Sequence, residues 1–166
     1  MHRDSDKCRN AICRAVTADF SAETEPHVCQ GVRQIRADLK LVPRVSYADS
    51  STVTADLRIV DADCQKSYET FVATANALPQ DTSDSARVAA QTEAILDKAY
   101  RLKMQHYSGH NVEGVHAWIV TTLGATHKVM EQWLASLKPV VRQGVLAGIS
   151  KALVHSRALR ASLCPY

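Results

Sequence analysis

Apolar residues recur at three- and four-residue spacing through most of this chain, and that periodicity limits what the chain can fold into. The longest run starts after Ser51 and continues to Leu78, directly before Pro79. Its apolar positions are Val53, Leu57, Val60, Cys64, Tyr68, Phe71, Ala75 and Leu78. Such spacing places the side chains on one face of a helix. We therefore expect a long helix over 51–78, opened by the capping signal Asp49-Ser50-Ser51.

Further helices are predicted on both sides by the same spacing. They cover 5–20, 26–42, 84–108, 111–137 and 139–159, with breaks at Pro43, Gly109 and Pro139. Residues 44–53 could be extended, but no other stretch alternates apolar and polar residues to provide a pairing strand. Short connections between long helices favour antiparallel neighbours. The predicted fold is all-α, an up-and-down bundle of five to six helices.

One domain is expected for a chain of 166 residues. It spans 1–166, with 1–25 as an N-terminal, cysteine-containing extension packed on the bundle. The cysteines are Cys8, Cys13, Cys29, Cys64 and Cys164. Their concentration near the two ends favours disulfides that hold the termini, although those on apolar faces could instead be small core residues. The pairing cannot be deduced from spacing.

Charge and hydropathy narrow the classes of partner. The formal net charge is only +3, and no basic run is interleaved with aromatic residues, so no nucleic-acid partner is expected. No run of 18 uncharged apolar residues occurs, so no transmembrane segment is predicted. The opening MHRDSDKCRNAIC lacks the apolar core of a secretory signal, which fits either a cytosolic protein or the mature form of a secreted one.

Histidines are the first candidates for chemistry. His106 and His110 are four residues apart, as are His127 and Glu131, and this spacing is typical of two metal ligands on one helical face. A metal-binding bundle that uses His106, His127 and Glu131 is therefore one alternative. Surface histidines explain the same pattern, and no metal or other cofactor is expected.

Carboxylate pairs and nucleophile motifs give no catalytic centre. The aspartates at 61 and 63 do not converge on a helix, and those at 81 and 84 are typical of capping. Neither a glycine-rich phosphate loop nor a recognisable nucleophile–base pair is present. We therefore predict no catalytic residues, and the protein is not expected to be an enzyme.

The segment WLASLKPVVRQGVLAGISKAL, residues 133–153, bears on a possible cavity. Gly144 and Gly148 lie one turn apart, and each costs about 1 kcal/mol of helix propensity relative to alanine. Such positions indicate either close packing of another helix or space for a ligand. Trp118 and Trp133, with nearby methionines, could line an adaptable apolar pocket.

A family resemblance favours the pocket. The matching segments are VRQIRADL, VTADLRIVDADCQKSYETFVATANAL, PQDTSDSARV, AAQTEAILDKAYRLKMQ and WLASLKPVVRQGVLAGISKAL. From about Val32 to Ala161 the chain thus resembles the fungal hydrophobic surface-binding protein A family, which includes cell-wall galactomannoproteins. The resemblance implies a secreted fungal helical bundle. Some members hold fatty acids or similar lipids in a central cavity, and others adsorb to hydrophobic surfaces.

The function expected from these features is non-enzymatic. We expect a secreted, extracellular helical bundle that binds a lipid, fatty acid or other apolar small molecule in its interior. The residues predicted to line the ligand are Leu57, Phe71, Ile95, Leu102, Ile119, Leu123, Val145 and Ile149. The alternative is a secreted effector-type interaction protein with a fully packed core and a host or cell-surface protein as partner.

Overall fold

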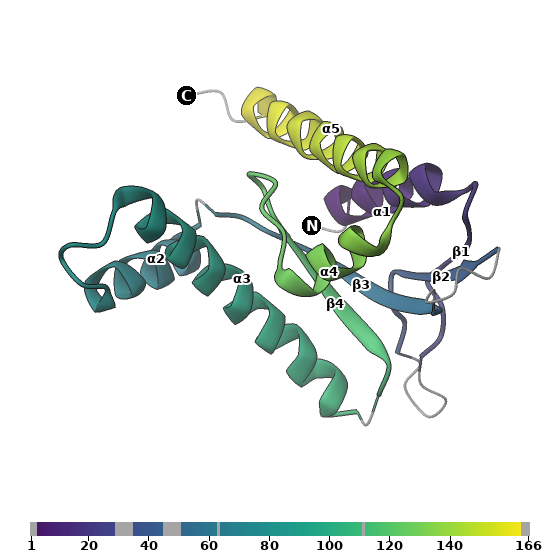
Figure 1. Ribbon diagram of the computed structural model, residues 1–166, viewed down its shortest axis with the longest axis horizontal. Helices are drawn as coiled ribbons and strands as arrows, with labels where there is room; N and C mark the ends of the chain where they lie inside the picture. Colours follow the sequence, from purple (N-terminus) through teal and green to yellow (C-terminus); the bar gives the residue numbers. More distant parts are fainter. Residues whose placement is uncertain (1–2, 29–34, 45–50, 63, 111, 164–166) are drawn as a thin grey trace.

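The computed structural model describes residues 3–28, 35–44, 51–62, 64–110 and 112–163, and over these ranges the chain is a mixed α/β protein (Figure 1). Its elements in order are α1 (Arg3–Val16), β1 (Phe20–Thr24), β2 (Leu39–Pro43), β3 (Val53–Val60), α2 (Gln65–Ala77), α3 (Asp84–Ser108), β4 (Val115–Thr121), α4 (Lys128–Ser136) and α5 (Pro139–Leu163). The predicted all-α bundle is therefore wrong, because four stretches of the described chain pair as strands.

The four strands form one mixed sheet in the order β1-β2-β3-β4. The β1–β2 and β2–β3 pairs are antiparallel, whereas β3 and β4 are parallel, with Asp56 opposite Ala117. Parallel neighbours need a long crossover connection, and the α2–α3 hairpin supplies it. After β3, the chain therefore has to run back along the sheet before it enters β4, and α3 is the helix that does so.

The helix predicted over 51–78 is the largest error. Its first part is β3, in which Val53, Ala55, Leu57 and Ile59 face one side of the sheet and pack into one apolar cluster. Val53, Leu57 and Val60 also satisfy a helical spacing, so the two periods coincide over this short stretch. The strand forms because it is paired along both edges, with β2 and β4, and buried on both faces.

The helix predicted over 111–137 is also wrong in its first half. Residues Val115–Thr121 form β4, a nearly continuous apolar run that is buried on both faces of the sheet. A turn at Gly124, whose φ is +93°, separates this strand from α4. An α-helix needs a φ of about −63°, so a residue with this positive φ cannot belong to a continuous helix. Glycine adopts such a φ without strain. The predicted helix over 26–42 is replaced in its described part by β2, and residues 29–34 lie outside the described ranges.

Helix predictions for α1, α3 and α5 are confirmed. Helix α3 begins after Ser83, whose hydroxyl accepts a hydrogen bond from the Ala86 N–H, and ends at Gly109 as expected. Pro139 is the first residue of α5 rather than a kink within a longer helix. Of the helices in the described ranges, none has the length and apolar character needed to span a bilayer.

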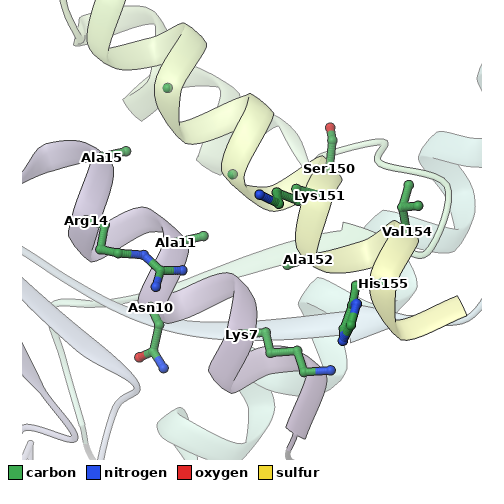
Figure 2. A pocket seen from close by; sticks show the side chains of 12 residues that line it. Lys7, Asn10, Ala11, Arg14, Ala15, Ser150, Lys151, Ala152, Val154 and His155 are labelled. Carbon is green, nitrogen blue, oxygen red and sulfur yellow. The ribbon is translucent and has the colours of Figure 1, made fainter. Parts of the chain in front are cut away.

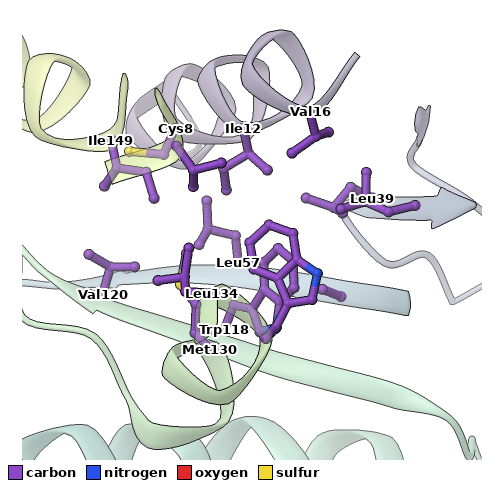
Figure 3. Close-up of a cluster of buried hydrophobic side chains, with 14 of the residues drawn as sticks. Cys8, Ile12, Val16, Leu39, Leu57, Trp118, Val120, Met130, Leu134 and Ile149 are labelled. Atoms are coloured by element: carbon purple, nitrogen blue, oxygen red, sulfur yellow. The ribbon is translucent and has the colours of Figure 1, made fainter. Parts of the chain in front are cut away.

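Helices cover both faces of the sheet. On one face, α1, α4 and α5 bury a cluster against the strands that includes Ile12, Leu57, Trp118, Met130 and Ile149 (Figure 3). On the other face, α3 packs on β4 through a smaller apolar cluster, and α2 packs on α3. Within residues 1–25, expected to be an extension packed on the domain, α1 and β1 contribute Cys8, Ile12, Val16 and Phe20 to this cluster.

The predicted disulfides are not found among the described residues. Cys8, Cys13 and Cys64 are free thiols, while Cys29 and Cys164 lie outside the described ranges. Cys8 is fully buried in the core beneath α1, where burial, assisted by repulsion from Asp4, raises the pKa of its thiol to about 11. The alternative interpretation, small core residues, concerns Cys13, Cys29 and Cys64; Cys13 is only partly buried and Cys64 is exposed, whereas Cys8 is the cysteine that packs in the core.

The close approach of α1 and α5 generates a testable difference between two glycines of α5. A Cβ on Gly144 would lie 3.6 Å from the Ala15 Cβ, an ordinary contact, but a Cβ on Gly148 would lie 3.1 Å from the Ala11 Cβ. We expect Gly144→Ala to raise the unfolding free energy by up to about 1 kcal/mol through helix propensity. Gly148→Ala should gain clearly less, because its methyl group must push the helices apart.

Urea unfolding followed by circular dichroism measures both variants against the wild-type chain. Equal gains for the two substitutions would contradict the tight α1–α5 packing at Gly148.

Candidate functional site

Two aspartates meet on neighbouring strands at the face of the sheet that α3 covers. Asp38 directly precedes β2, and its backbone N–H donates to the Ala55 carbonyl, so the antiparallel register places it opposite Asp56 of β3. The Asp38 Oδ2 accepts a hydrogen bond from the Leu57 N–H at 2.7 Å. The side chains of Asp38 and Asp56 are hydrogen-bonded to each other. Two carboxyl groups this close share a proton or require a cation between them.

Helix α3 supplies the partners of Asp56. Lys103 and Tyr107 lie one turn apart on α3 and reach the same carboxylate oxygen. The Lys103 Nζ is 2.6 Å from Asp56 Oδ2, and the Tyr107 hydroxyl donates a hydrogen bond to that oxygen. Asp56 is 6% exposed and Tyr107 is 1% exposed, whereas the Lys103 side chain remains 25% exposed. The Lys103 side chain is thus more open to solvent than Asp56 and Tyr107.

The electrostatics of the pair favour a bound proton or cation. Burial raises the pKa of Asp38 to about 7, and its hydrogen bond to Asp56 and repulsion from that carboxylate act in the same direction. The Leu57 N–H and the charge of Lys103 oppose this shift but do not cancel it. Burial also raises the pKa of Tyr107, so its phenol stays protonated as a donor. A carboxyl group with a pKa near neutrality in a polar cluster is a recognised sign of a functional site.

More cations flank the aspartates on the same face. Alternation along β2 and β3 places Lys40 and Arg58 on the side of Asp38 and Asp56, and Lys40 is directly opposite Thr54. Beside this pair of residues lies a groove of about 210 Å³. It is lined by Pro26, His27, Val28, Lys40, Thr54, Glu113, Gly114 and Val115. An anionic substrate would therefore find positive side chains on either side of the two carboxyl groups.

A second polar cluster involves one of the predicted metal ligands. His127 is buried, its Nε2 lies 2.9 Å from Asp97 Oδ1, and its Nδ1 accepts a hydrogen bond from the Val129 N–H at 3.4 Å. Its ring stacks on Tyr100 with centroids 4.3 Å apart. Burial disfavours ionisation of Asp97, but hydrogen bonds from His127 and Lys128 outweigh it and lower the pKa of Asp97. Both ring nitrogens are engaged, so His127 caps α4 and fixes it to α3.

The other predicted metal ligands do not join this cluster. His106 is exposed near the end of α3, with its ring 5.2 Å from that of His110, and Glu131 accepts a hydrogen bond from Thr126. Across the described part of the chain, no three His, Cys, Asp or Glu side chains are placed to hold a metal ion together. A site with two carboxylates, such as Asp38 and Asp56, relies on water or substrate for its remaining ligands.

The eight residues predicted to line an apolar ligand lie in several separate environments. Leu57, Val145 and Ile149 are buried in the cluster between the sheet and α1 and α5, and Ile119 is buried on the opposite face, under α3. Ile95 is buried within α3. The exposed members are Phe71, Leu102 and Leu123. A lipid-binding role therefore stays a prediction with no common cavity assigned to these side chains.

The sequence analysis missed Asp38, Asp56, Lys103 and Tyr107. One signal could have found the aspartates, because the tetrapeptide ADLK at 37–40 recurs as ADLR at 55–58. Each copy places an aspartate inside a short apolar stretch followed by a cation, and the fold pairs the two copies side by side. No protein-family model and no curated protein matches this chain. Its function is therefore inferred from the geometry of these residues.

The raised pKa of Asp38 predicts a pH-dependent stability. Below about pH 4 the carboxyl group is protonated in both the folded and the unfolded chain, so it contributes nothing. Between about pH 4 and pH 7 only the unfolded chain releases the proton, which lowers the unfolding free energy, and the loss is complete above pH 7. Asp38→Asn removes this titration while retaining an acceptor for the Leu57 N–H.

We compare the melting temperature of Asp38→Asn with that of wild type at each pH. We expect this difference to be roughly 2–4 °C more positive at pH 8 than at pH 4. This corresponds to about 1 kcal/mol for a domain of this size, and the partial solvation of Asp38 keeps the effect small. Asp81→Asn, in the exposed loop between α2 and α3, is the control. If the melting temperature changes by the same amount between pH 4 and pH 8 in wild type and in Asp38→Asn, the shifted titration of Asp38 is refuted.

Proposed function

We propose that the protein is a divalent-cation-dependent hydrolase of phosphodiester bonds in nucleic acids, with Asp38, Asp56 and Lys103 at its catalytic centre. The observation that carries this proposal is the meeting of two carboxyl groups from adjacent strands with an ammonium group 2.6 Å from one of them. It departs from the expectation of a non-enzymatic protein without a metal or a nucleic-acid partner, because the charge and spacing patterns behind that expectation do not show that Asp38, Asp56 and Lys103 converge in the fold.

The carboxyl pair fits a cation such as Mg²⁺. This ion is commonly bound by only one or two protein carboxylates, together with waters and substrate phosphates. The raised pKa of Asp38 beside Asp56 marks a place where positive charge lowers the repulsion between the two carboxyl groups. When bound there, the cation would supply Lewis acidity toward a phosphoryl oxygen and help to activate a water molecule.

The cations around the pair favour a phosphodiester over a neutral substrate. Lys103 places a point charge at the carboxylates, and Lys40 and Arg58 extend positive charge along β2 and β3. Lysine and arginine are the usual protein partners of phosphate oxygens. The groove beside Lys40 and Thr54 is open and partly polar, which suits a chain passing over the sheet more than a small enclosed molecule.

In hydrolysis, a water oxygen attacks phosphorus and the bond from phosphorus to one ester oxygen breaks. The departing oxygen receives one proton of the attacking water, and the products are a phosphomonoester and an alcohol. Lys103 is placed to stabilise the negative charge that grows on the phosphoryl oxygens. Tyr107 donates to Asp56 and holds that carboxylate in place, so it is a positioning residue.

This proposal predicts a cation-dependent cleavage activity that the aspartates control. With Mg²⁺ or Mn²⁺, the purified chain should cleave fluorescently labelled DNA or RNA, and EDTA should abolish the activity. Asp38→Asn and Asp56→Asn should each lower kcat/KM by at least about 100-fold, because each removes a charge that holds the cation. Product formation on denaturing gels measures the rates.

Cation binding can be measured without activity. Mg²⁺ should raise the melting temperature of the wild-type chain more at pH 8 than at pH 5, since protons compete for the carboxyl pair at the lower pH. The increase should disappear in Asp56→Asn and persist in Asp81→Asn. Full cleavage by Asp56→Asn, or cleavage in EDTA, would refute the proposed centre.

A further inference from the structure

An open hollow lies between α1 and α5, on the opposite face of the sheet from Asp38 and Asp56. It is an open groove of about 1150 Å³. Figure 2 shows side chains of both helices around it, with Lys7 and Arg14 on α1 and Lys151 and His155 on α5. These helices come from opposite ends of the chain and cover the face of the sheet that is turned away from α3.

Small residues make this groove narrow. Gly144 and Gly148 of α5 face Ala15 and Ala11 of α1, with distances of 3.6 and 3.1 Å from a hypothetical Cβ to the alanine Cβ. Without side chains between them, the backbones of the two helices approach closely. The longer side chains on either side of this contact therefore border one common groove instead of two separate helix surfaces.

The charge of the groove has one sign. Among the described residues that line it there is no aspartate or glutamate, while Lys7, Arg14 and Lys151 are permanent cations. Arg14 and Lys151 are exposed. The whole of α5 carries only basic residues among its charged side chains. Asn10 and Ser150 add neutral hydrogen-bonding groups.

We propose that this groove binds the phosphate backbone of a nucleic acid, as an anchoring site separate from the catalytic centre. The proposal rests on the proposed function, because a polyanionic substrate gives the groove its occupant. The lining residues of α5 extend from Gly144 to His155, about 16 Å at 1.5 Å per residue. Measured along the axis of a duplex, this length corresponds to roughly five base pairs at 3.4 Å each.

The position of the groove relative to Asp56 determines how it can contribute to substrate binding. Asp56 faces α3, whereas the groove lies on the outer side of α1 and α5, so the two sites cannot hold the same phosphate. Contacts to phosphates carry affinity without sequence information. The groove thus raises the local concentration of a long substrate, and it contributes nothing to a substrate too short to reach both sites.

Binding and its salt dependence test the groove directly. The variant Arg14→Gln/Lys151→Gln removes two exposed cations, and Lys66→Gln/Lys98→Gln removes two exposed cations from α2 and α3 as the matched control. Fluorescence anisotropy with a labelled DNA duplex in EDTA, at a series of NaCl concentrations, measures the affinity without cleavage. We expect the groove variant to bind at least about tenfold more weakly and its salt slope to fall by about 2.

A small substrate separates the two proposals. Hydrolysis of bis(4-nitrophenyl) phosphate with Mn²⁺ needs the catalytic centre alone, so the groove variant should retain wild-type rates on it while losing cleavage of long duplexes. No hydrolysis by the wild-type chain, combined with weaker duplex binding by the groove variant, would refute the catalytic proposal only.

The groove proposal has its own refuting outcomes. Equal duplex affinity in the groove and control variants would overturn it. The proposal would also be overturned if the groove variant lost binding to phosphatidylcholine–phosphatidylserine vesicles but kept wild-type affinity for the duplex. That result would indicate that the groove faces a membrane surface. Circular dichroism and melting temperature establish that each double variant is folded.

Discussion

The parallel pairing of β3 with β4 determines where the candidate catalytic groups lie. Parallel neighbours cannot be joined by a tight turn, so the chain must leave the sheet and return through the α2–α3 hairpin. Helix α3 then packs on β4 through Leu96 and Ala99 against Ala117 and Ile119. Because Ala117 is opposite Asp56, this packing also holds the end of α3 above Asp56. A shift in that register would separate the lysine and tyrosine of α3 from the carboxylate.

The antiparallel pairing of β2 with β3 sets up an unfavourable contact within the same region. It places two aspartates side by side in a poorly solvated position, where ionisation of Asp38 is disfavoured by burial and by the neighbouring Asp56. An amide at Asp38 would relieve this repulsion, whereas removal of the Asp56 carboxylate would leave the Lys103 ammonium without its ion-pair partner. Both carboxyl groups are nevertheless present, and a lysine and a buried tyrosine are directed at one of them. Such an arrangement, which lowers stability, is typical of functional sites.

The long helices could be predicted from sequence because capping residues and glycines agree with their periodicity. Ser83, Gly109 and Pro139 mark boundaries that the structure retains. The strands could not, since β3 is short and its apolar residues satisfy the helical and the alternating period together. The run that forms β4 is apolar on both faces, so it has no period to distinguish a buried strand from a buried helix.

The site was hidden for a different reason. Asp38, Asp56 and Lys103 are far apart in the sequence, and only the sheet and its crossover bring them together. The acidic pairs visible in the sequence, at 61–63 and 81–84, are local neighbours with no such convergence. The repeated tetrapeptides ADLK and ADLR were the accessible clue, but they carry meaning only once two strands are known to pair.

The grouping of basic residues is likewise visible only in the folded protein. A net charge of +3 and scattered basic residues do not indicate a polyanion partner in the sequence. The fold changes this by uniting cations from the first and last helices across a contact of glycine and alanine. Bulky side chains at Gly144 and Gly148, unlike a single methyl group at Gly144, would separate the helices and spread those charges over two surfaces. The small residues first considered as space for an apolar ligand therefore act, in this fold, to concentrate positive charge.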